Sequence, residues 1–387
     1  MKSLGLYIHI PFCVTKCNYC DFLSLGGMSG EDHAIYIDAL SAELEYYADK
    51  GVLLDSIYIG GGTPSLLAHG LISRIMEKVR SCFSLAKTAE ITIESNPGLL
   101  DADKLTAYRR AGVNRLSIGA QSLNDELLHF MGRVHNSDTF IRNYALARDC
   151  GFENISVDLM FAIPGQTLDI WMDSLERTVD LEPEHISFYS LQIEEGTPFF
   201  ELRKKGVMEP VEDEVDRCMY RDTIDLLKGR GYRHYEISNA AKPSYESRHN
   251  LKYWSMDEYL GVGLGAHSYV DGWRFSNETD LKKYLRVKGG TFRNDRQSGA
   301  GPWATWLHEN TTSDEMSEFL FTGLRKIEGI ALSVFEEKFG LSLAAVYGAS
   351  VAKHEKSGLL EMDLRADRLR LTAKGMNLFN QVLIDFI

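Results

Sequence analysis

The sequence predicts an α/β fold in which six parallel strands form an open or partial barrel, followed by a smaller helix-rich domain. Two observations lead to this prediction. Over the first two-thirds of the chain, short runs rich in Ile, Val and Tyr alternate with segments of helical periodicity, a pattern typical of parallel strands joined by crossover helices. Beyond about Pro302 this rhythm gives way to consecutive helical runs. Six units are too few for a closed eight-unit barrel.

The elements follow from this reading in chain order. Strands are predicted at 4–10, 55–59, 89–94, 115–119, 155–159 and 185–191, and the helices between them at 32–47, 71–82, 102–111, 139–150 and 168–181. The last part of the chain is predicted to hold helices at 312–324, 332–338, 343–357 and 372–386, with a hairpin of strands 359–362 and 368–371. Helices followed by a small hairpin resemble a winged-helix arrangement. We therefore expect two domains, 1–300 and 301–387, with the glycine-rich run 289–301 as a flexible link or lid.

Composition narrows the class of protein. Of 387 residues, 44% are hydrophobic and 25% charged, as in ordinary globular proteins. The net charge of −13 and the lack of a basic run argue against nucleic-acid binding. No apolar stretch is long enough for a bilayer span, and a cysteine motif stands where a signal peptide would be. Six cysteines, three of them clustered, suit a reducing compartment. We expect a cytoplasmic protein in which Cys82, Cys150 and Cys218 are core residues.

Three cysteines near the N-terminus are the most specific chemical signal. Cys13, Cys17 and Cys20 lie in the run YIHIPFCVTKCNYCDF, with the spacing C-x3-C-x2-C. Three thiolates this close can hold three corners of a cuboidal iron–sulfur cluster. No fourth cysteine follows before Cys82, so one iron would keep an open position for a small molecule. A zinc site of three cysteines completed by His9 is the alternative from spacing alone.

This motif, with an aromatic residue (Tyr19) before its last cysteine, resembles that of the radical S-adenosylmethionine proteins. The flanking YIHIPFC and CDF are similar to one branch of that superfamily, which contains oxygen-independent coproporphyrinogen III oxidase and the HemW-type heme chaperones. The resemblance covers nearly the whole chain. It implies a (β/α)6 partial barrel, a 4Fe–4S cluster on the three cysteines, and S-adenosylmethionine at the open iron.

The other motifs fall at the carboxyl ends of the predicted strands, where such sheets bind ligands. Gly60, Gly61 and Gly62 follow the second strand and let the backbone approach a ligand; a tight turn capped by Thr63 and Ser65 is the alternative. Glu94 ends the third strand and could accept hydrogen bonds from a ribose diol. The resemblance implies that S-adenosylmethionine binds at Tyr7, Tyr19, Gly61, Gly62, Thr63, Glu94, Gln121, Arg133 and Asp158, with Arg133 facing the ligand carboxylate.

A second motif separates the two branches. Residues 249–254 read HNLKYW and match the HNxxYW heme-binding motif of the chaperones. The match implies heme binding by His249, Asn250, Tyr253 and Trp254, with His249 as a candidate axial ligand, the two aromatic residues against the macrocycle, and Arg248 or Lys252 near its propionates. A structural histidine in a polar loop is the alternative. His267, in GLGAHSY, is a second candidate ligand.

Two departures from the oxidase pattern favour the chaperone. The oxidase motif continues to a further cysteine two residues on, where this chain has Phe22, and the oxidase carries an N-terminal extension for which Cys13 leaves no room. We expect a heme chaperone, monomeric or dimeric, that binds a 4Fe–4S cluster, S-adenosylmethionine and heme and delivers heme to soluble or membrane-bound acceptor hemoproteins. Oxygen-independent coproporphyrinogen III oxidase is the alternative function.

Overall fold

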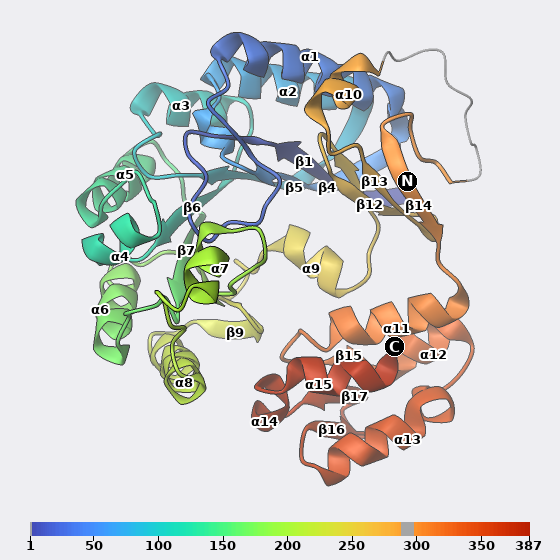
Figure 1. Cartoon of the computed structure of the whole chain (residues 1–387). Coiled ribbons are helices and arrows are strands. Elements are labelled where there is room, and N and C mark those ends of the chain that lie inside the picture. The colour runs from blue at the N-terminus through green and yellow to red at the C-terminus, as the bar shows by residue number, and fades with distance from the viewer. Residues whose placement is uncertain (1, 288–297) are drawn as a thin grey trace.

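The computed structural model describes residues 2–287 and 298–387, and its centre is a twelve-stranded sheet. Six neighbouring strands of this sheet run parallel, in the order in which they occur along the chain. They are β1 (Lys2–Ile10), β4 (Asp49–Gly61), β5 (Phe83–Ser95), β6 (Arg115–Gln121), β7 (Ile155–Phe161) and β8 (His185–Ser190). The curved sheet with helices along its outer side (Figure 1) confirms the predicted partial barrel.

The outer helices also match the prediction, within two residues at each end. They are α1 (Gly30–Tyr46), α2 (His69–Cys82), α3 (Ala102–Arg110), α5 (Ser137–Asp149) and α6 (Leu168–Val179), with the short α4 (Asp125–Phe130) before α5. Most begin where a side chain caps the first turn: Ser29 forms a capping box with Asp32, and Asp101 and Asn136 accept from backbone N–H groups of α3 and α5. Local sequence therefore sets these boundaries.

The sheet continues past the six parallel strands on both sides. Next to β8 lie β10 (Asn239–Ala241) and β9 (Arg233–Glu236). Next to β1 lie β11 (Tyr259–Val262), β12 (His267–Val270), β13 (Trp273–Asn277) and β14 (Ala304–Glu309). Two short strands, β2 (Phe12–Cys13) and β3 (Leu25–Gly26), pair at the cysteine loop, and further helices are α7 (Pro198–Lys204), α8 (Asp213–Gly229), α9 (Arg248–Trp254) and α10 (Leu281–Arg286).

Strand β14 bears on the domain boundary expected at residue 300. It forms an antiparallel ladder with β13, so residues 304–309 belong to the large sheet. We propose that the boundary falls after Glu309. Such a pairing joins segments far apart in the chain, which is why local periodicity does not reveal it. Most of the predicted link or lid at 289–301 lies outside the described residues.

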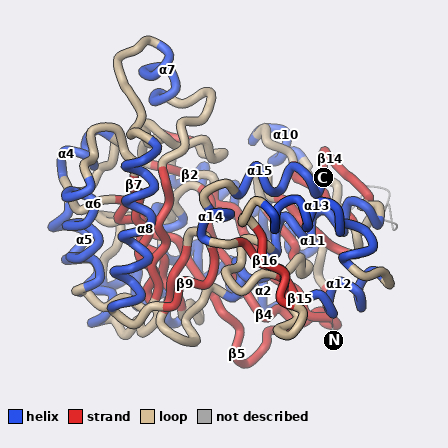
Figure 2. The backbone as a smooth tube through the Cα atoms, turned by 90° about the horizontal axis from the view of Figure 1, so that it is seen from below, coloured by secondary structure: helices blue, strands red, loops and turns tan. Residues whose placement is uncertain are grey.

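The last part of the chain forms a separate small core, as the change in sequence pattern predicts. It contains α11 (Thr312–Gly323), α12 (Leu332–Phe339), α13 (Leu343–Lys356), α14 (Ala373–Met376) and α15 (Phe379–Leu383). The predicted hairpin is present as β16 (Leu360–Asp363) and β17 (Arg368–Leu371), and β15 (Ile330–Ala331), which was not predicted, adds a third strand. The predicted helix 372–386 is broken into α14, α15 and the 3-10 turn Ile384–Phe386. Figure 2 shows this unit beside the large sheet.

The three isolated cysteines differ in burial. Cys82 is buried, as predicted, whereas Cys150 and Cys218 are only partly buried. Cys218 lies on α8 with an Arg221 nitrogen 3.5 Å from its sulfur, so its prediction as a core residue is wrong. Among the described residues, no helix has the length and apolarity needed to cross a bilayer.

Candidate functional site

The carboxyl ends of the parallel strands surround a cavity of about 500 Å3. All but one of the residues predicted for the cluster and S-adenosylmethionine line it. These are Cys13, Cys17, Tyr19, Cys20, Gly61, Gly62, Thr63, Glu94, Gln121, Arg133 and Asp158. The fold thus gathers at one edge of the sheet side chains that are up to 145 residues apart in sequence (13 to 158).

Hydrogen bonds to the end of α4 fix the position of the cysteine loop. Asn18, between the second and third cysteines, donates its backbone N–H to Met131 (3.0 Å) and its side-chain amide to Phe130 (2.8 Å), at the end of α4. The N–H of Cys20 bonds to the carbonyl of Cys17 (3.2 Å) and closes a turn. The three thiols are free and partly exposed toward the cavity. Three partly exposed thiols on one anchored loop fit the ligand set of a cluster that keeps one open iron.

The alternative of a Cys3His zinc site does not fit this arrangement. The His9 ring is engaged elsewhere: its Nδ1 lies 2.9 Å from the Tyr7 hydroxyl and its Nε2 2.9 Å from the Leu23 carbonyl. In the part of the chain that the structure describes, no three His, Cys, Asp or Glu side chains converge to hold a single metal ion. The donor set therefore suits a multi-iron cluster better than one zinc ion.

A continuous chain of hydrogen bonds connects two of the cysteines. The Thr63 hydroxyl lies 3.4 Å from the Cys13 sulfur and accepts from the Asn96 amide (3.1 Å). The Asn96 carbonyl oxygen accepts from Arg133 (2.8 Å), and Arg133 also donates to the sulfur of Cys17 (3.6 Å). Thr63 precedes a short 3-10 turn but makes no capping bond, so its hydroxyl serves the cysteine side of the site. Donors at ligand sulfurs tune the potential of a cluster.

Two arginines at this cavity have unused donors. Arg133 gives its second terminal nitrogen to Gly119 and Asn96, but its buried Nε has no partner. Arg115, which begins β6 and is buried, likewise has an unpaired Nε. A buried guanidinium donor without an acceptor is costly in a folded protein, and both side chains line the cavity. They therefore fit an anionic ligand group such as a carboxylate.

Glu94 is already engaged by the protein. Its two carboxylate oxygens accept from the Tyr58 hydroxyl (2.8 Å) and the Gly61 N–H (3.0 Å). Burial raises the pKa of Glu94 to about 7, because desolvation disfavours the charged form, and the nearby Asp158 adds to the rise. A ribose diol would meet a carboxylate that these two bonds hold in a fixed orientation.

Close packing requires glycine at positions 61 and 62, and both residues also border the ligand cavity. Gly61 has φ +112°, and a Cβ there would lie 2.5 Å from the His9 ring. A Cβ at Gly62 would lie 2.8 Å from the carbonyl oxygen of Phe12. The absence of side chains is thus required by the close approach of the end of β4 to β1 and the segment after it, while both residues still line the cavity.

Gln121 and Asp158 complete the rim. Gln121 is the last residue of β6 and has φ +65°, a conformation that is uncommon for non-glycine residues. Asp158 lies in the middle of β7, not at its end as expected, and accepts from the Ser117 hydroxyl (3.0 Å). Burial raises the pKa of the Asp158 carboxyl, with the surrounding hydroxyl donors opposing the rise.

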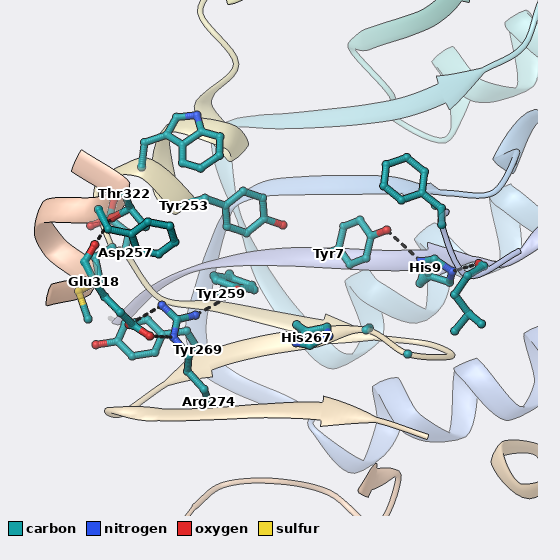
Figure 3. A pocket seen from close by; sticks show the side chains of 18 of the residues that line it. Tyr7, His9, Tyr253, Asp257, Tyr259, His267, Tyr269, Arg274, Glu318 and Thr322 are labelled. Atoms are coloured by element: carbon teal, nitrogen blue, oxygen red, sulfur yellow. Dashed lines mark hydrogen bonds and ion pairs between the residues drawn. The ribbon is translucent and has the colours of Figure 1, made fainter. Parts of the chain in front are cut away.

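Tyr7 is the exception among the predicted residues. It lines a second cavity of about 660 Å3, which shares Phe22, Gly61 and Glu94 with the first. This larger cavity lies between the β11–β13 strands, α9 and α11 of the C-terminal unit, and Figure 3 shows tyrosine rings around it. Its lining includes Tyr253, Trp254, Tyr259, Tyr269, His267 and Arg274. The two cavities are neighbours, so a ligand in one would lie close to a ligand in the other.

The HNLKYW segment forms the helix α9 rather than the expected loop, and Ser247 caps it. His249 is completely buried, its Nδ1 lies 2.9 Å from the Ser56 hydroxyl, and its Nε2 lies 2.9 Å from the Tyr253 hydroxyl. Both ring nitrogens thus have partners, and this conformation does not offer His249 to a heme iron. Tyr253 and Trp254 line the larger cavity and Asn250 the cluster-side one.

The two cations beside His249 are directed elsewhere. Arg248 donates to the carbonyls of Thr88 and Asp55, and Lys252 pairs with the Asp55 carboxylate at 2.9 Å. Neither lines the larger cavity, so the expectation that they meet heme propionates does not agree with the structure. The cation at that cavity is Arg274, which sequence reasoning missed.

Comparison with known proteins places this chain in a family. Residues 7–178 match the model of the radical SAM superfamily, and residues 310–378 match the model of the HemN C-terminal domain. The heme chaperone HemW of Bacillus subtilis is 37% identical over 393 aligned residues, covering 100% of this chain and 99% of that protein. The chain belongs to the HemW heme chaperone family. The HemW of Lactococcus lactis is 34% identical with 100% of this chain covered, and that of Escherichia coli 41% identical over 70%.

The oxidase branch shares the architecture of this HemW family member. The solved structure of coproporphyrinogen III oxidase (HemN) from Escherichia coli, described as a radical SAM enzyme, superimposes with a TM-score of 0.84 at 25% identity. It covers 100% of this chain and 90% of that one. Phe22, which stands where the oxidase motif is expected to have a further cysteine, is 64% exposed and lies at the border of both cavities. As a member of a radical SAM family, the chain uses a 4Fe–4S cluster and S-adenosylmethionine.

Arg115 and Asn96 are site residues that the sequence analysis missed, although Arg115 begins a predicted strand and Asn96 lies two residues after Glu94. Arg115 opens RLSIGAQ, an otherwise uncharged buried strand, and a charged residue there is a signal of function. Asn96 follows Glu94 in IESNP.

Proposed function

We propose that this chain is a heme chaperone that binds heme in the larger cavity and transfers it to acceptor hemoproteins. The main supporting observation is a cavity of about 660 Å3 that is lined by aromatic rings and lies directly beside the cluster-side cavity. Its size lies within the range of small-molecule sites, roughly 300–1,000 Å3, and flat aromatic walls suit a planar macrocycle. The full-length relationship to HemW proteins supports the same function.

The cluster-side cavity supplies the other ligands of this function. Cys13, Cys17 and Cys20 would hold the 4Fe–4S cluster, and this cluster supplies one-electron chemistry when it is bound. Arg133 would hold the carboxylate of S-adenosylmethionine through its unpaired Nε, and Glu94 would accept from its ribose. Thr63 and Asn96 keep Arg133 aligned with the cysteine loop.

The HNLKYW segment would contribute to the heme site through its aromatic residues. Tyr253 and Trp254 form part of the wall, and Asn250 lies on the side of the cluster. His249 would act behind them, because its Nε2 fixes the Tyr253 hydroxyl. We further propose a cytoplasmic location, a monomer or dimer, soluble or membrane-bound acceptors, and no nucleic-acid partner.

The oxidase function is the second candidate, favoured by the superposition on HemN over the whole chain. One experiment separates the two. Anaerobically reconstituted protein is titrated with heme and, separately, incubated with coproporphyrinogen III, S-adenosylmethionine and a reductant. The chaperone function is supported if a saturable Soret band forms, if heme then moves from this protein to an apo-globin, and if no decarboxylated product appears. Conversion of coproporphyrinogen to its divinyl product would establish the oxidase, and absence of saturable heme binding would refute the proposed function.

A further inference from the structure

The larger cavity contains a histidine that the HNLKYW motif does not include. His267 lines the cavity and is exposed, and among the described residues neither of its ring nitrogens has a hydrogen-bond partner. We propose that His267 ligates the iron of heme bound in this cavity, and that His249 is a positioning residue for the wall opposite. This inference rests on the proposed heme-binding function.

The strand pattern explains why His267 faces the cavity. Residues two apart on a strand point to the same side of the sheet, and both His267 and Tyr269 of β12 line the cavity, while Ser268 between them is buried. Arg274 of β13 pairs directly with Tyr269 and lies on the same side. Figure 3 shows His267 on this hairpin, facing the space bordered by Tyr7 and Tyr253.

The backbone at His267 is fixed by close packing. A Cβ at Gly261 of β11 would lie 2.1 Å from the His267 carbonyl oxygen, so only glycine allows β12 to approach β11 there. The preceding turn is tied to α1: the Leu264 N–H bonds to the Tyr36 hydroxyl (2.9 Å), and the Gly263 N–H bonds to the Glu43 carboxylate (2.9 Å). A ligand histidine on a rigid strand is held at a defined distance from its metal.

The other histidine, three of the tyrosines and the methionine that line the cavity are already engaged. His9 is buried, with both ring nitrogens bonded to Tyr7 and Leu23. The Tyr7 hydroxyl lies against His9, and the Tyr253 hydroxyl against His249. The Tyr269 hydroxyl donates to Glu315 at 2.8 Å, and Met256 is buried in the C-terminal core.

Tyr259 and Arg274 form part of the floor. Arg274 donates to both oxygens of Glu318 (2.6 and 2.7 Å), approaches the Tyr259 hydroxyl at 3.5 Å and lies 4.5 Å over the Tyr269 ring. Burial raises the pKa of Tyr259, so its phenol stays protonated and is a poor iron ligand.

His249 has the surroundings of a structural residue. Its ring lies between Ser56 and Tyr253 and stacks on Tyr58 with centroids 5.4 Å apart. The backbone N–H groups of Arg248 and His249 both donate to the Glu90 carboxylate (3.1 Å each). Burial lowers the pKa of His249 to about 3, so the ring is neutral. It holds α9 against β4 and sets the position of Tyr253.

The test compares single variants of the cluster-loaded full chain by optical and electron paramagnetic resonance spectra of bound heme. His267→Ala should lose the imidazole-ligated spectrum. Its heme affinity should fall at least about tenfold, because removing even a residue that only supports a metal ligand weakens metal binding by about 10- to 100-fold. Added imidazole should restore the spectrum in this variant. His69→Ala, an exposed histidine at the start of α2, is the matched control and should resemble the parent.

The remaining outcomes separate this inference from the proposed function. His249→Gln, which keeps side-chain hydrogen-bonding groups in the buried space, should retain the imidazole-ligated spectrum. If His267→Ala and His267→Gln both keep the parental spectrum and affinity, the assignment of His267 is wrong while heme binding stands. If His249→Gln alone loses the imidazole spectrum, His249 is the ligand. If the parent itself shows no saturable heme binding, the proposed function fails and this inference fails with it.

Discussion

The carboxyl group of Glu43 links the stability of the protein to the turn that precedes His267, and its replacement gives a measurable pH signature. Glu43 lies on α1 and is completely buried. It accepts from the Tyr284 hydroxyl (2.5 Å), the Gly263 N–H (2.9 Å) and the Asn277 amide (2.6 Å). Burial raises the pKa of Glu43 from 4.5 to about 7, against the opposing effect of these three donors.

The sign of the pH effect follows from where each state holds its proton. Between pH of about 4.5 and 7 the native protein keeps the Glu43 proton that the unfolded chain has released. The free energy of unfolding therefore falls as the pH rises through this range. The shift from 4.5 to about 7 corresponds to roughly 3 kcal/mol, at about 1.4 kcal/mol per pKa unit.

Glu43→Gln removes the titration but keeps the shape. At pH 5 the variant should be less stable than the parent by about 1–3 kcal/mol, because the new amide leaves one of the buried donors unpaired. Between pH 5 and 8 the parent loses the contribution of its protonated carboxyl and the variant does not. The stability difference should therefore shrink by roughly 2.5 kcal/mol and approach zero or reverse.

Urea denaturation of the cluster-loaded protein under anaerobic conditions, followed by circular dichroism, measures this difference at pH 5, 6, 7 and 8. Glu45→Gln, an exposed carboxylate on the same helix paired with Lys78, is the matched control for the substitution. A difference between parent and Glu43→Gln that stays constant from pH 5 to 8 would refute the reasoning, because it would mean that the buried carboxyl does not change its charge in this range.

Three further predictions concern the ligands. Cys→Ala at position 13, 17 or 20 should strongly reduce the iron content of reconstituted protein from about four irons per chain, as a three-thiolate cluster requires; full iron retention in the triple variant, or stoichiometric zinc in the parent, would contradict this. Glu94→Ala should weaken S-adenosylmethionine binding on the order of ten- to a hundredfold, since charge-assisted hydrogen bonds contribute roughly 1.5–3 kcal/mol; calorimetry that finds unchanged affinity for Glu94→Ala, Arg133→Ala and Asp158→Ala would place the ligand elsewhere. Trp254→Ala should weaken heme affinity without altering the ligand-dependent spectrum, because it removes packing only; an altered Soret position with unchanged affinity would argue against a wall role.

Local pattern was sufficient to predict most of the fold. The α1 and α3 boundaries follow from Ser29 and Asp101, which cap these helices through their own side chains. The parallel strands are buried along almost their whole length because helices cover one face and the barrel interior the other, as for 115–121. What escaped prediction depends on long-range pairing: β14 joins β13 across the chain segment between them, and β15 is only two residues long.

The candidate site, like the fold, was only partly predictable from sequence. Residues at strand ends converge because parallel strands end at one edge, so Glu94 and the cysteines could be placed together from sequence. Arg133, which follows α4, was assigned to the site only by the family resemblance. Tyr7 could not be assigned to its cavity, because it lies on β1, which borders both the cluster side and the β11 side. The pairing of Arg274 with Glu318 joins the large sheet to the C-terminal unit, and no local pattern indicates it.

Whether a histidine can bind a metal depends on whether its nitrogens are free, and this is a property of the folded chain. His249 lies in the motif that sequence comparison favours, yet Ser56, 193 residues away in sequence, occupies one of its nitrogens and Tyr253 the other. Replacing one of these bonds by an iron bond would leave the Ser56 or the Tyr253 hydroxyl without its partner, a cost of about 1–3 kcal/mol. His267 lies in a run of small residues with little chemical signal, but iron binding there breaks no hydrogen bond among the described residues. The difference in cost favours His267 as the ligand and explains how a motif can be required for heme binding without supplying the bond to iron.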